Sequence, residues 1–317
     1  MTSNGSSAEE YHMKKRLALG VGSILLVILG IIAFVPSCRL VVLGRLKGER
    51  CYRGLPVSYW LYSLESYGDY AQAVEALKAI GPDAIRSIIS LLAETEALDS
   101  NGGDVIKDRI EHDLRSFGLN KAADERASKV SRRREILVGA LREFGKDAIP
   151  VLLDSLKSDD REIASTAARA LARLGADAVP AIVLALQDDS CKVRRGAAYA
   201  LALMGREAKG TDAFLIAAMG DADVSVRQWA VYALSRIDPD VEKAVPALVK
   251  GLTDQDPQVQ RFSVKALGDI GPKAKLAVPV LTDMLHHKGE GLDTLAAEAL
   301  ERIDPEKKNM AGIDFKR

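Results

Sequence analysis

The segment GADAVPAIVLALQDDSCKVRRGAAYALALMG, residues 175–205, indicates the fold most clearly. It holds two apolar segments on either side of a polar turn at residues 187–190, and a glycine stands at each end. Small and aliphatic residues recur three and four positions apart in both segments, which is the pattern of amphipathic α-helices. Pro180 suits the first turn of a helix, because the amide hydrogen that proline lacks has no partner there. The stretch therefore predicts a helical hairpin.

The same pattern returns along the chain with a fixed internal spacing. Each unit starts with a proline or an alanine and has a leucine 21 residues later. The starting positions are Pro56, Pro150, Pro180, Ala213, Pro246 and Pro279, and the leucines are Leu77, Leu171, Leu201, Leu234, Leu267 and Leu300. Units 30–33 residues apart are typical of helical solenoids, in which each hairpin covers its apolar face with the next one. We predict an all-α fold, an α-solenoid of about seven hairpins over residues 56–304.

One unit is interrupted by an insertion. Residues 81–86 (GPDAIR) match the start of later units, but Leu141 follows Arg86 only after 55 residues, which exceeds the usual spacing by 34. We place the insertion at about 97–130, in the turn of this hairpin. Residues 99–103 (DSNGG) predict a loop and residues 105–117 a helix, and we expect the delayed second helix to begin near Arg132. The insertion is either a contact surface or an excursion without a role.

Further columns predict how each helix begins and ends. Ten positions after the start column stand residues that are mostly favoured as N-caps: Ser66, Asp160, Ser190, Asp223, Asp256 and Gly289. Alanines next to the leucine column allow helices to approach closely: Ala76, Ala170, Ala200, Ala233, Ala266 and Ala299. Glycines stop the second helices because they tolerate a left-handed turn: Gly81, Gly145, Gly175, Gly205 and Gly271. Asp238 and Asp304 each precede a proline, and we expect them to end their helices by a different route.

An uncharged apolar segment precedes the repeats. Residues 17–38 contain no charged side chain and follow Lys14, Lys15 and Arg16. At about 1.5 Å per residue such a helix would span roughly 33 Å, enough for a hydrocarbon core of about 30 Å. We predict a single-pass transmembrane helix and hence a membrane localisation. A cleaved signal peptide remains an alternative, since residues 35–37 resemble a cleavage site.

The membrane segment sets the remaining boundaries. We expect a cytoplasmic or flexible tail at 1–16, a juxtamembrane linker at 39–55 and a C-terminal tail at 305–317. Basic residues lie on both sides of the apolar segment, so the side of the membrane that carries the repeats stays open.

Composition argues against several classes of function. The 44 basic and 44 acidic residues balance, so no global field favours nucleic acid. Cys38, Cys51 and Cys191 have the spacing of neither a disulfide framework nor a metal site, and we expect His286 and His287 to lie on the surface. Phosphate-binding glycine loops and nucleophile elbows are missing from the sequence. We expect no cofactor, no metal, no small-molecule substrate and no enzymatic activity.

The repeated motifs allow a resemblance to be named. The A-V/I-P-x-L opening, the D-x-D turn, the V-R-x-x-A start of the second helix and the A-L-x-x-I/L-G ending resemble HEAT repeats. They are most similar to the short bacterial type grouped with phycobilisome-lyase HEAT-like proteins, an armadillo-like helical fold. The flank at residues 52–60 (YRGLPVSYW) also resembles the lead-in of membrane-tethered bacterial HEAT proteins. The resemblance implies a membrane-anchored scaffold or adaptor that binds proteins through its concave surface. A bilin lyase-like activity, or another HEAT-repeat enzyme activity such as a hydroxylase, is the alternative it suggests.

The resemblance also implies roles for the polar residues of the second helices. In such solenoids these helices line the concave side, and the exposed positions form what we call the basic stripe: Arg169, Arg173, Arg195, Tyr199, Gln228, Tyr232, Arg236, Arg261 and Lys265. Residues four apart share a helix face, and Arg and Tyr are favoured interface anchors. We therefore predict that the basic stripe binds an acidic protein segment, with a merely solvated face as the alternative.

HEAT repeats also use Asp and Arg side chains to join successive repeats. The resemblance assigns Arg194, Arg227, Asp188 and Asp221 to a structural ladder of this kind. Ala164 and Gln260 stand at the equivalent positions of the neighbouring repeats and are expected to interrupt it.

Overall fold

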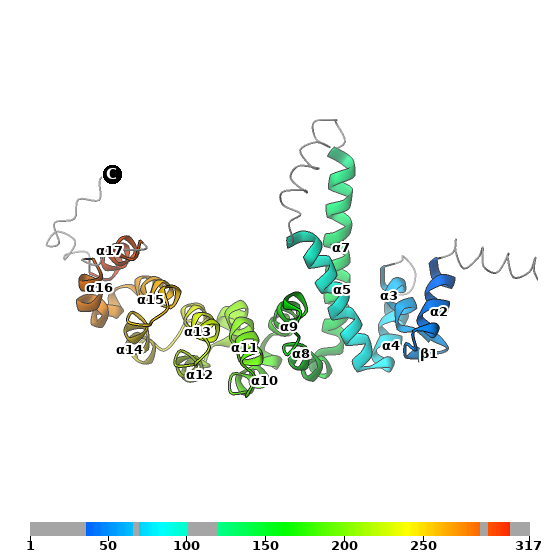
Figure 1. Ribbon diagram of the computed structural model, residues 1–317, viewed down its shortest axis with the longest axis horizontal. Helices are drawn as coiled ribbons and strands as arrows, with labels where there is room; N and C mark the ends of the chain where they lie inside the picture. Colours follow the sequence, from blue (N-terminus) through cyan, green and yellow to red (C-terminus); the bar gives the residue numbers. More distant parts are fainter. Residues whose placement is uncertain (1–35, 66–69, 101–119, 286–290, 305–317) are drawn as a thin grey trace, which may run out of the picture. The chain divides into compact units, whose positions relative to one another are not determined.

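The computed structural model describes residues 36–65, 70–100, 120–285 and 291–304. The chain divides into two compact units, Met1–Ile88 and Ile89–Arg317, and Figure 1 labels their elements along the chain. Most of the predicted transmembrane segment (17–38) and the tails at 1–16 and 305–317 lie outside the described residues. Among the helices of the described ranges, none combines the length and the apolar character that a membrane span requires.

The first unit begins with structure where we expected a linker. Helix α2 (Pro36–Leu46) is followed by strands β1 (Cys51–Tyr52) and β2 (Leu55–Pro56), which pair antiparallel with Tyr52 opposite Leu55. The two residues between the strands, Arg53 and Gly54, both have positive φ angles, as a tight two-residue hairpin turn requires. Residues 39–55 therefore contain a helix end and a β-hairpin.

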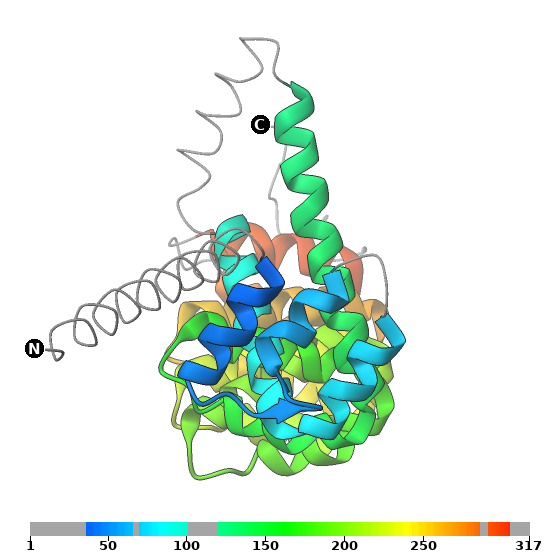
Figure 2. The same cartoon turned by 90° about the vertical axis from the view of Figure 1, so that its right-hand side faces the viewer.

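Trp60 holds this small unit together. It lies in helix α3 (Val57–Glu65), is 4% exposed, and donates a hydrogen bond from Nε1 to the Leu55 carbonyl at 3.2 Å. Its ring also lies edge-on to the rings of Tyr52 and Tyr59. Helix α3 packs against α4 (Tyr70–Ile80) and α2, and Figure 2 shows the hairpin beside them. Within the motif at 52–60, Pro56, Val57 and Trp60 are buried in the first unit, whereas Arg53 and Gly54 are exposed at the turn.

The interrupted hairpin has longer helices than the sequence predicted. Helix α5 (Pro82–Ser100) continues through residues 99 and 100, where we expected a loop. Helix α7 (Asn120–Phe144) starts well before Arg132. Its first half is rich in Ala, Lys, Glu and Arg and contains neither glycine nor proline, so its intrinsic helix propensity is high. The helix expected at 105–117 lies outside the described residues.

Five regular helix pairs follow in the second unit. They are α8 (Ile149–Ser155) with α9 (Arg161–Arg173), α10 (Val179–Ala185) with α11 (Cys191–Met204), α12 (Asp212–Ala218) with α13 (Val224–Arg236), α14 (Val241–Gly251) with α15 (Pro257–Ile270), and α16 (Val278–Met284) with α17 (Leu292–Ile303). In the first unit, α3 and α4 form a further packed pair. The regular pairs agree with the predicted all-α repeat solenoid.

The first helices mostly start at the predicted column, with two exceptions. Pro150, Pro180 and Pro279 lie in the first turn of their helices, each after a 3₁₀ turn that begins at a glycine. Pro56 instead ends strand β2, so α3 starts one residue later. Pro246 lies inside α14, contrary to our expectation that it opens the helix. Helix α14 starts early because Asp240 accepts a hydrogen bond from the Glu242 N–H and caps residues that are 3₁₀ in other repeats.

The predicted N-caps hold at four described positions: Asp160, Ser190, Asp223 and Asp256. The three aspartates accept hydrogen bonds from free backbone amides of the next turn, whereas the Ser190 side chain makes no capping bond. Ser66 and Gly289 lie outside the described residues.

Helix ends differ from expectation at Asp238. Its φ angle is 57°, a positive value like those of Gly205 and Gly271 at the ends of other second helices. We had expected a separate mechanism there, yet aspartate is one of the few residues that tolerate this region. Asp304, with φ −145°, does end its helix differently.

The core of the second unit lies between two layers of helices. Helix α11 packs against α9 and α13, and α15 packs against α13 and α17, so the second helices form one layer. The first helices form the other layer, as Figure 1 shows from α8 to α17. The leucine column is buried between the layers, and Leu171, Leu201, Leu234 and Leu267 are completely inaccessible to solvent. Each hairpin therefore completes the core of its neighbours.

Replacing Leu234 by alanine should reduce the free energy of unfolding by about 2–5 kcal/mol, because the lost methyl groups leave a cavity between helices that cannot collapse fully. Leu184→Ala is the matched control: Leu184 is 72% exposed, and its loss should cost about 0.5 kcal/mol or less. Urea denaturation followed by circular dichroism measures both. Equal effects for the two leucines would contradict this packing.

Candidate functional site

Arg194 joins one repeat to the next at the hairpin turns. It projects from α11, and its Nε and Nη2 donate to the two carboxylate oxygens of Asp221 at 2.7 and 2.9 Å. Its Nη1 donates to the carbonyl oxygens of Asp188 and Asp189, both at 2.9 Å. One guanidinium therefore fixes the turn of its own repeat and the turn of the following one.

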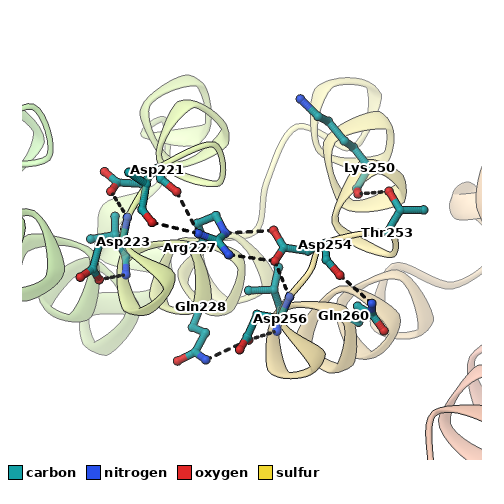
Figure 3. A network of polar contacts seen from close by, with 12 residues as sticks. Asp221, Asp223, Arg227, Gln228, Lys250, Thr253, Asp254, Asp256 and Gln260 are labelled. Atoms are coloured by element: carbon teal, nitrogen blue, oxygen red, sulfur yellow. Dashed lines mark hydrogen bonds and ion pairs between the residues drawn. The ribbon is translucent and has the colours of Figure 1, made fainter. Parts of the chain in front are cut away.

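Arg227 repeats this arrangement one layer further on. Its Nε and Nη2 donate to the Asp254 carboxylate, both at 3.0 Å, and its Nη1 donates to the carbonyls of Asp221 and Ala222. Figure 3 shows Arg227 between Asp221 and Asp254, with each aspartate belonging to a different turn. The aspartates also stabilise the turns, because Asp188, Asp221 and Asp254 each accept the N–H of the second residue that follows.

The ends of this ladder follow from single residues. Gln260 keeps half of the arginine's role, since its Nε2 donates to the Asp254 carbonyl at 2.6 Å. Its side chain carries no charge for a further carboxylate. At the other end, Ala164 stands where an arginine would reach Asp188. The charged ladder thus runs from the turn at Asp188 to the turn at Asp254.

The ladder residues are shielded enough for their charges to matter. The side chains of Arg194 and Asp221 are 18% and 10% exposed, and those of Arg227 and Asp254 are 16% and 15% exposed. The hydrogen bonds from Arg194 hold the pKa of Asp221 below its ordinary value. Burial raises the pKa of Asp254, but the bonds from Arg227 and from the Asp256 N–H outweigh it, so that pKa is also lowered. The same pairs raise the pKa of both guanidinium groups.

Two residues of the predicted basic stripe also make contacts between repeats. Arg195 lies 3.4 Å from the carboxylate of Asp223, and the Gln228 amide donates to Asp256 at 2.9 Å. Both partners are N-caps of the next second helix. The stripe residues near the N-terminal ends of α11 and α13 therefore make structural contacts, although Arg195 keeps 44% of its side chain exposed.

The stripe residues that lie further along their helices face outward. Arg173, Arg236 and Lys265 are exposed, and Tyr199 and Tyr232 are half-buried beside them. The Arg236 guanidinium lies over the Tyr232 ring, 5.7 Å from its centroid. Arg169 is half-buried and donates to the Ser165 hydroxyl at 3.0 Å. Together with Arg142 and Arg173 it lines a shallow depression between α7 and α9. Arg261 is half-buried in α15.

The structure reveals aromatic residues that the sequence analysis missed. Trp229 packs against Tyr199 with ring centroids 4.5 Å apart and against Tyr232 at 5.9 Å. Phe262 extends this contact, 5.6 Å from Tyr232. We call these four rings on α11, α13 and α15 the aromatic row. Trp229 and Phe262 are 33 residues apart, one repeat, and this shared column was the signal that could have revealed them.

Candidate metal ligands do not assemble in the ranges that the structure describes, where no group of three or more His, Cys, Asp and Glu side chains could hold an ion. Cys51 and Cys191 are free thiols. His286 and His287 lie outside those ranges.

Comparison with known proteins defines the class. A family model for HEAT repeats matches residues 125–202, 149–235, 179–253 and 211–301, which together span more than half of the 317 residues. The chain therefore belongs to the HEAT-repeat family. No curated protein matches its sequence.

Several solved structures are similar to parts of this chain. A designed armadillo repeat protein in complex with peptide (KR)4 is 21% identical, with 55% of this chain and 94% of that chain covered and a TM-score of 0.40. The phycocyanin lyase complex from Nostoc is 21% identical over 53% of this chain and 71% of that chain, with a TM-score of 0.32. An archaeal HEAT-like repeats protein from Thermococcus onnurineus is 17% identical over 52% and 80%, with a TM-score of 0.35.

The ladder predicts a defined pH dependence of stability. Because the pKa of Asp221 is lowered in the folded chain, its ion pair stabilises fully above the ordinary pKa of about 3.9. That stability is lost as the pH falls through the lower folded value. Asp221→Asn should cost about 1–3 kcal/mol at pH 7, and the difference from wild type should shrink in acid.

Chemical denaturation at a series of pH values measures this difference. Asp154→Asn serves as the control, because Asp154 pairs with Lys157 on the surface and is 59% exposed. A deficit of Asp221→Asn that stays constant down to pH 3 would show that the carboxylate charge plays no part in the ladder.

Proposed function

We propose that this chain is a membrane-anchored scaffold or adaptor that binds an acidic segment of a partner protein through the exposed face of its second helices. The repeat architecture supports a binding role, because stacked hairpins present a long continuous surface. On this proposal the protein acts by association and not by catalysis.

The charge distribution of the second helices carries the proposal. Helices α9, α11, α13 and α15 contain ten basic residues but only two acidic ones, Glu162 and Asp269. The chain as a whole is balanced, so this excess is local to these four helices, whereas α17 carries three acidic residues and one basic residue. Asp269 is itself paired with Arg302 at 2.7 Å. A surface of this kind attracts a negatively charged partner.

The ladder separates structural from exposed cations. Lys192, Arg194 and Arg227 pair with the carboxylates of the hairpin turns. Arg173, Arg236 and Lys265 lie toward the C-terminal ends of their helices and are exposed. These three therefore supply the charge that a partner would meet.

The spacing of these cations favours a polypeptide as the partner. They lie on different second helices, and adjacent packed helices are about 8–10 Å apart, so a small anion would contact only one of them. A continuous phosphate backbone would also meet the carboxylates at the helix N-termini, such as Asp223 and Asp256. An acidic protein segment can space its charges to avoid them.

Reversing Arg173, Arg236 and Lys265 to glutamate should reduce capture of the partner about tenfold or more, because attraction becomes repulsion. Full-length wild type and variant would be used as baits on membranes of the source cells, with bound proteins quantified by mass spectrometry. Reversing Lys157, Arg206 and Lys250, three exposed cations outside the second helices, gives the same change in charge as a control. Equal capture by both variants would contradict the proposal, provided that circular dichroism shows unchanged helicity.

The proposed anchor rests on the 22 uncharged residues at 17–38. Wild type should remain in the membrane pellet after carbonate extraction. Replacing Leu25 and Ile28 by arginine should release it, because each arginine at a helix centre opposes insertion by about 2.5–3.5 kcal/mol. The same positions replaced by alanine form the control. Wild-type protein in the carbonate supernatant would contradict anchoring.

A further inference from the structure

We propose that the aromatic row, together with Leu203, is the seat for an apolar or aromatic anchor residue within the acidic segment of the partner. This inference rests on the proposed function and deepens it, because it adds a second chemical requirement to the negative charge of the partner. The basic stripe would attract the segment, and the row would fix its position.

The row places large apolar side chains next to a column of small buried residues in the second helices. Ala197, Ala230 and Ser263 are completely buried where the second helices approach one another. The residues that precede Ala230 and Ser263 are Trp229 and Phe262, which are half-buried at the face. In the two earlier repeats the same column holds Thr166 and Gly196, so its aromatic character is confined to α13 and α15.

Leu203 extends this surface. It follows Tyr199 by four residues, so both lie on one face of α11, and it is 42% exposed. Burying the solvent-exposed surface of these rings and of Leu203 under a partner would lower the free energy by about 25 cal/mol for each Å² of apolar surface. Large aromatic side chains are also the residues that most often dominate protein interfaces.

Cations border the row on both sides. Arg236 lies over the Tyr232 ring, Lys265 follows Phe262 by three residues, and Arg195 precedes Tyr199 by four. Helices α11 and α13 contain no acidic residue. A segment that places an apolar side chain on the rings would therefore have basic groups on either side of it. Charge complementarity selects an acidic polypeptide as the occupant.

Ring geometry favours a protein segment over single-stranded nucleic acid. Bases stack on aromatic faces that are open to solvent. Here the rings use their faces and edges on one another, with interplanar angles of 46°, 72° and 48°, and each is partly buried. The exposed parts of the four rings suit an aliphatic or aromatic side chain that inserts between the rings.

Trp229 offers a direct readout of occupancy. The chain has two tryptophans, Trp60 and Trp229. Trp60 is 4% exposed and is shielded from a dissolved quencher, whereas Trp229 is half-buried at the face. Acrylamide should therefore quench mainly Trp229 in the full chain. A peptide seated on the row should protect this fluorescence.

The test begins with selection of random short peptides displayed on phage against the full-length protein. We expect enriched sequences to be acidic and to contain at least one aromatic or leucine residue. A synthetic peptide from this pool should protect Trp229 from acrylamide. Its affinity should fall about tenfold or more for Trp229→Ala and for Leu203→Asp. Leu184→Asp, on the exposed side of a first helix, should bind like wild type.

The outcomes separate this inference from the proposed function. Acidic peptides that lack an apolar residue and bind Leu203→Asp normally would overturn the role of the row but leave the basic stripe in place. Peptide binding that survives reversal of Arg173, Arg236 and Lys265 would overturn the proposed function as well. An empty selection, or protection of Trp229 by oligo(dT) and not by any peptide, would overturn the acidic polypeptide as occupant.

Discussion

A helix pair as short as α10 and α11 cannot cover its own apolar residues, so each pair has to stack against its neighbours. The first helix has 7 residues and the second 14, and together they expose apolar side chains on both flanks of the pair. Leu201 and Leu234 are completely buried because the hairpins before and after them supply the missing walls. Stability is therefore shared between neighbours, and no repeat has a core of its own.

Stacking also forces polar groups at the turns into regular positions, where they must be satisfied. Asp221 accepts two bonds from Arg194 through its carboxylate and one from the Asp223 N–H, while its carbonyl accepts from Arg227. A single aspartate thus links two arginines of successive helices. The carboxylates of the hairpin turns neutralise cations near the N-termini of the second helices. Cations near the C-termini of these helices have no hairpin turn with carboxylates beside them. The division between structural and exposed basic residues follows from this asymmetry of each hairpin.

Sequence columns could predict whatever every repeat shares. Leu234 lies in a column of buried leucines, and Asp223 lies in a column that supplies N-cap positions, so spacing alone predicted the burial of one and the position of the other. Features that occur in a single repeat could not be predicted from the columns. Pro246 lies inside a helix because Asp240 caps that helix early, and Asp238 has a positive φ angle where other repeats have glycine. Arg195 is exposed, but its contact with Asp223 could not be predicted from the columns, because this N-cap lies 28 positions away in the sequence.

Packing explains why the aromatic row lies where it does. A side chain at Gly196 would come within 2.7 Å of Leu156 Cδ2, so no bulky residue fits that column of α11 without displacing a completely buried leucine. One repeat later Trp229 occupies the column and leans on Tyr199, at 4.5 Å between ring centroids. Tyr232 and Phe262 continue this ring contact toward α15. The core requires a glycine at position 196, and large side chains in this column therefore begin only at Trp229.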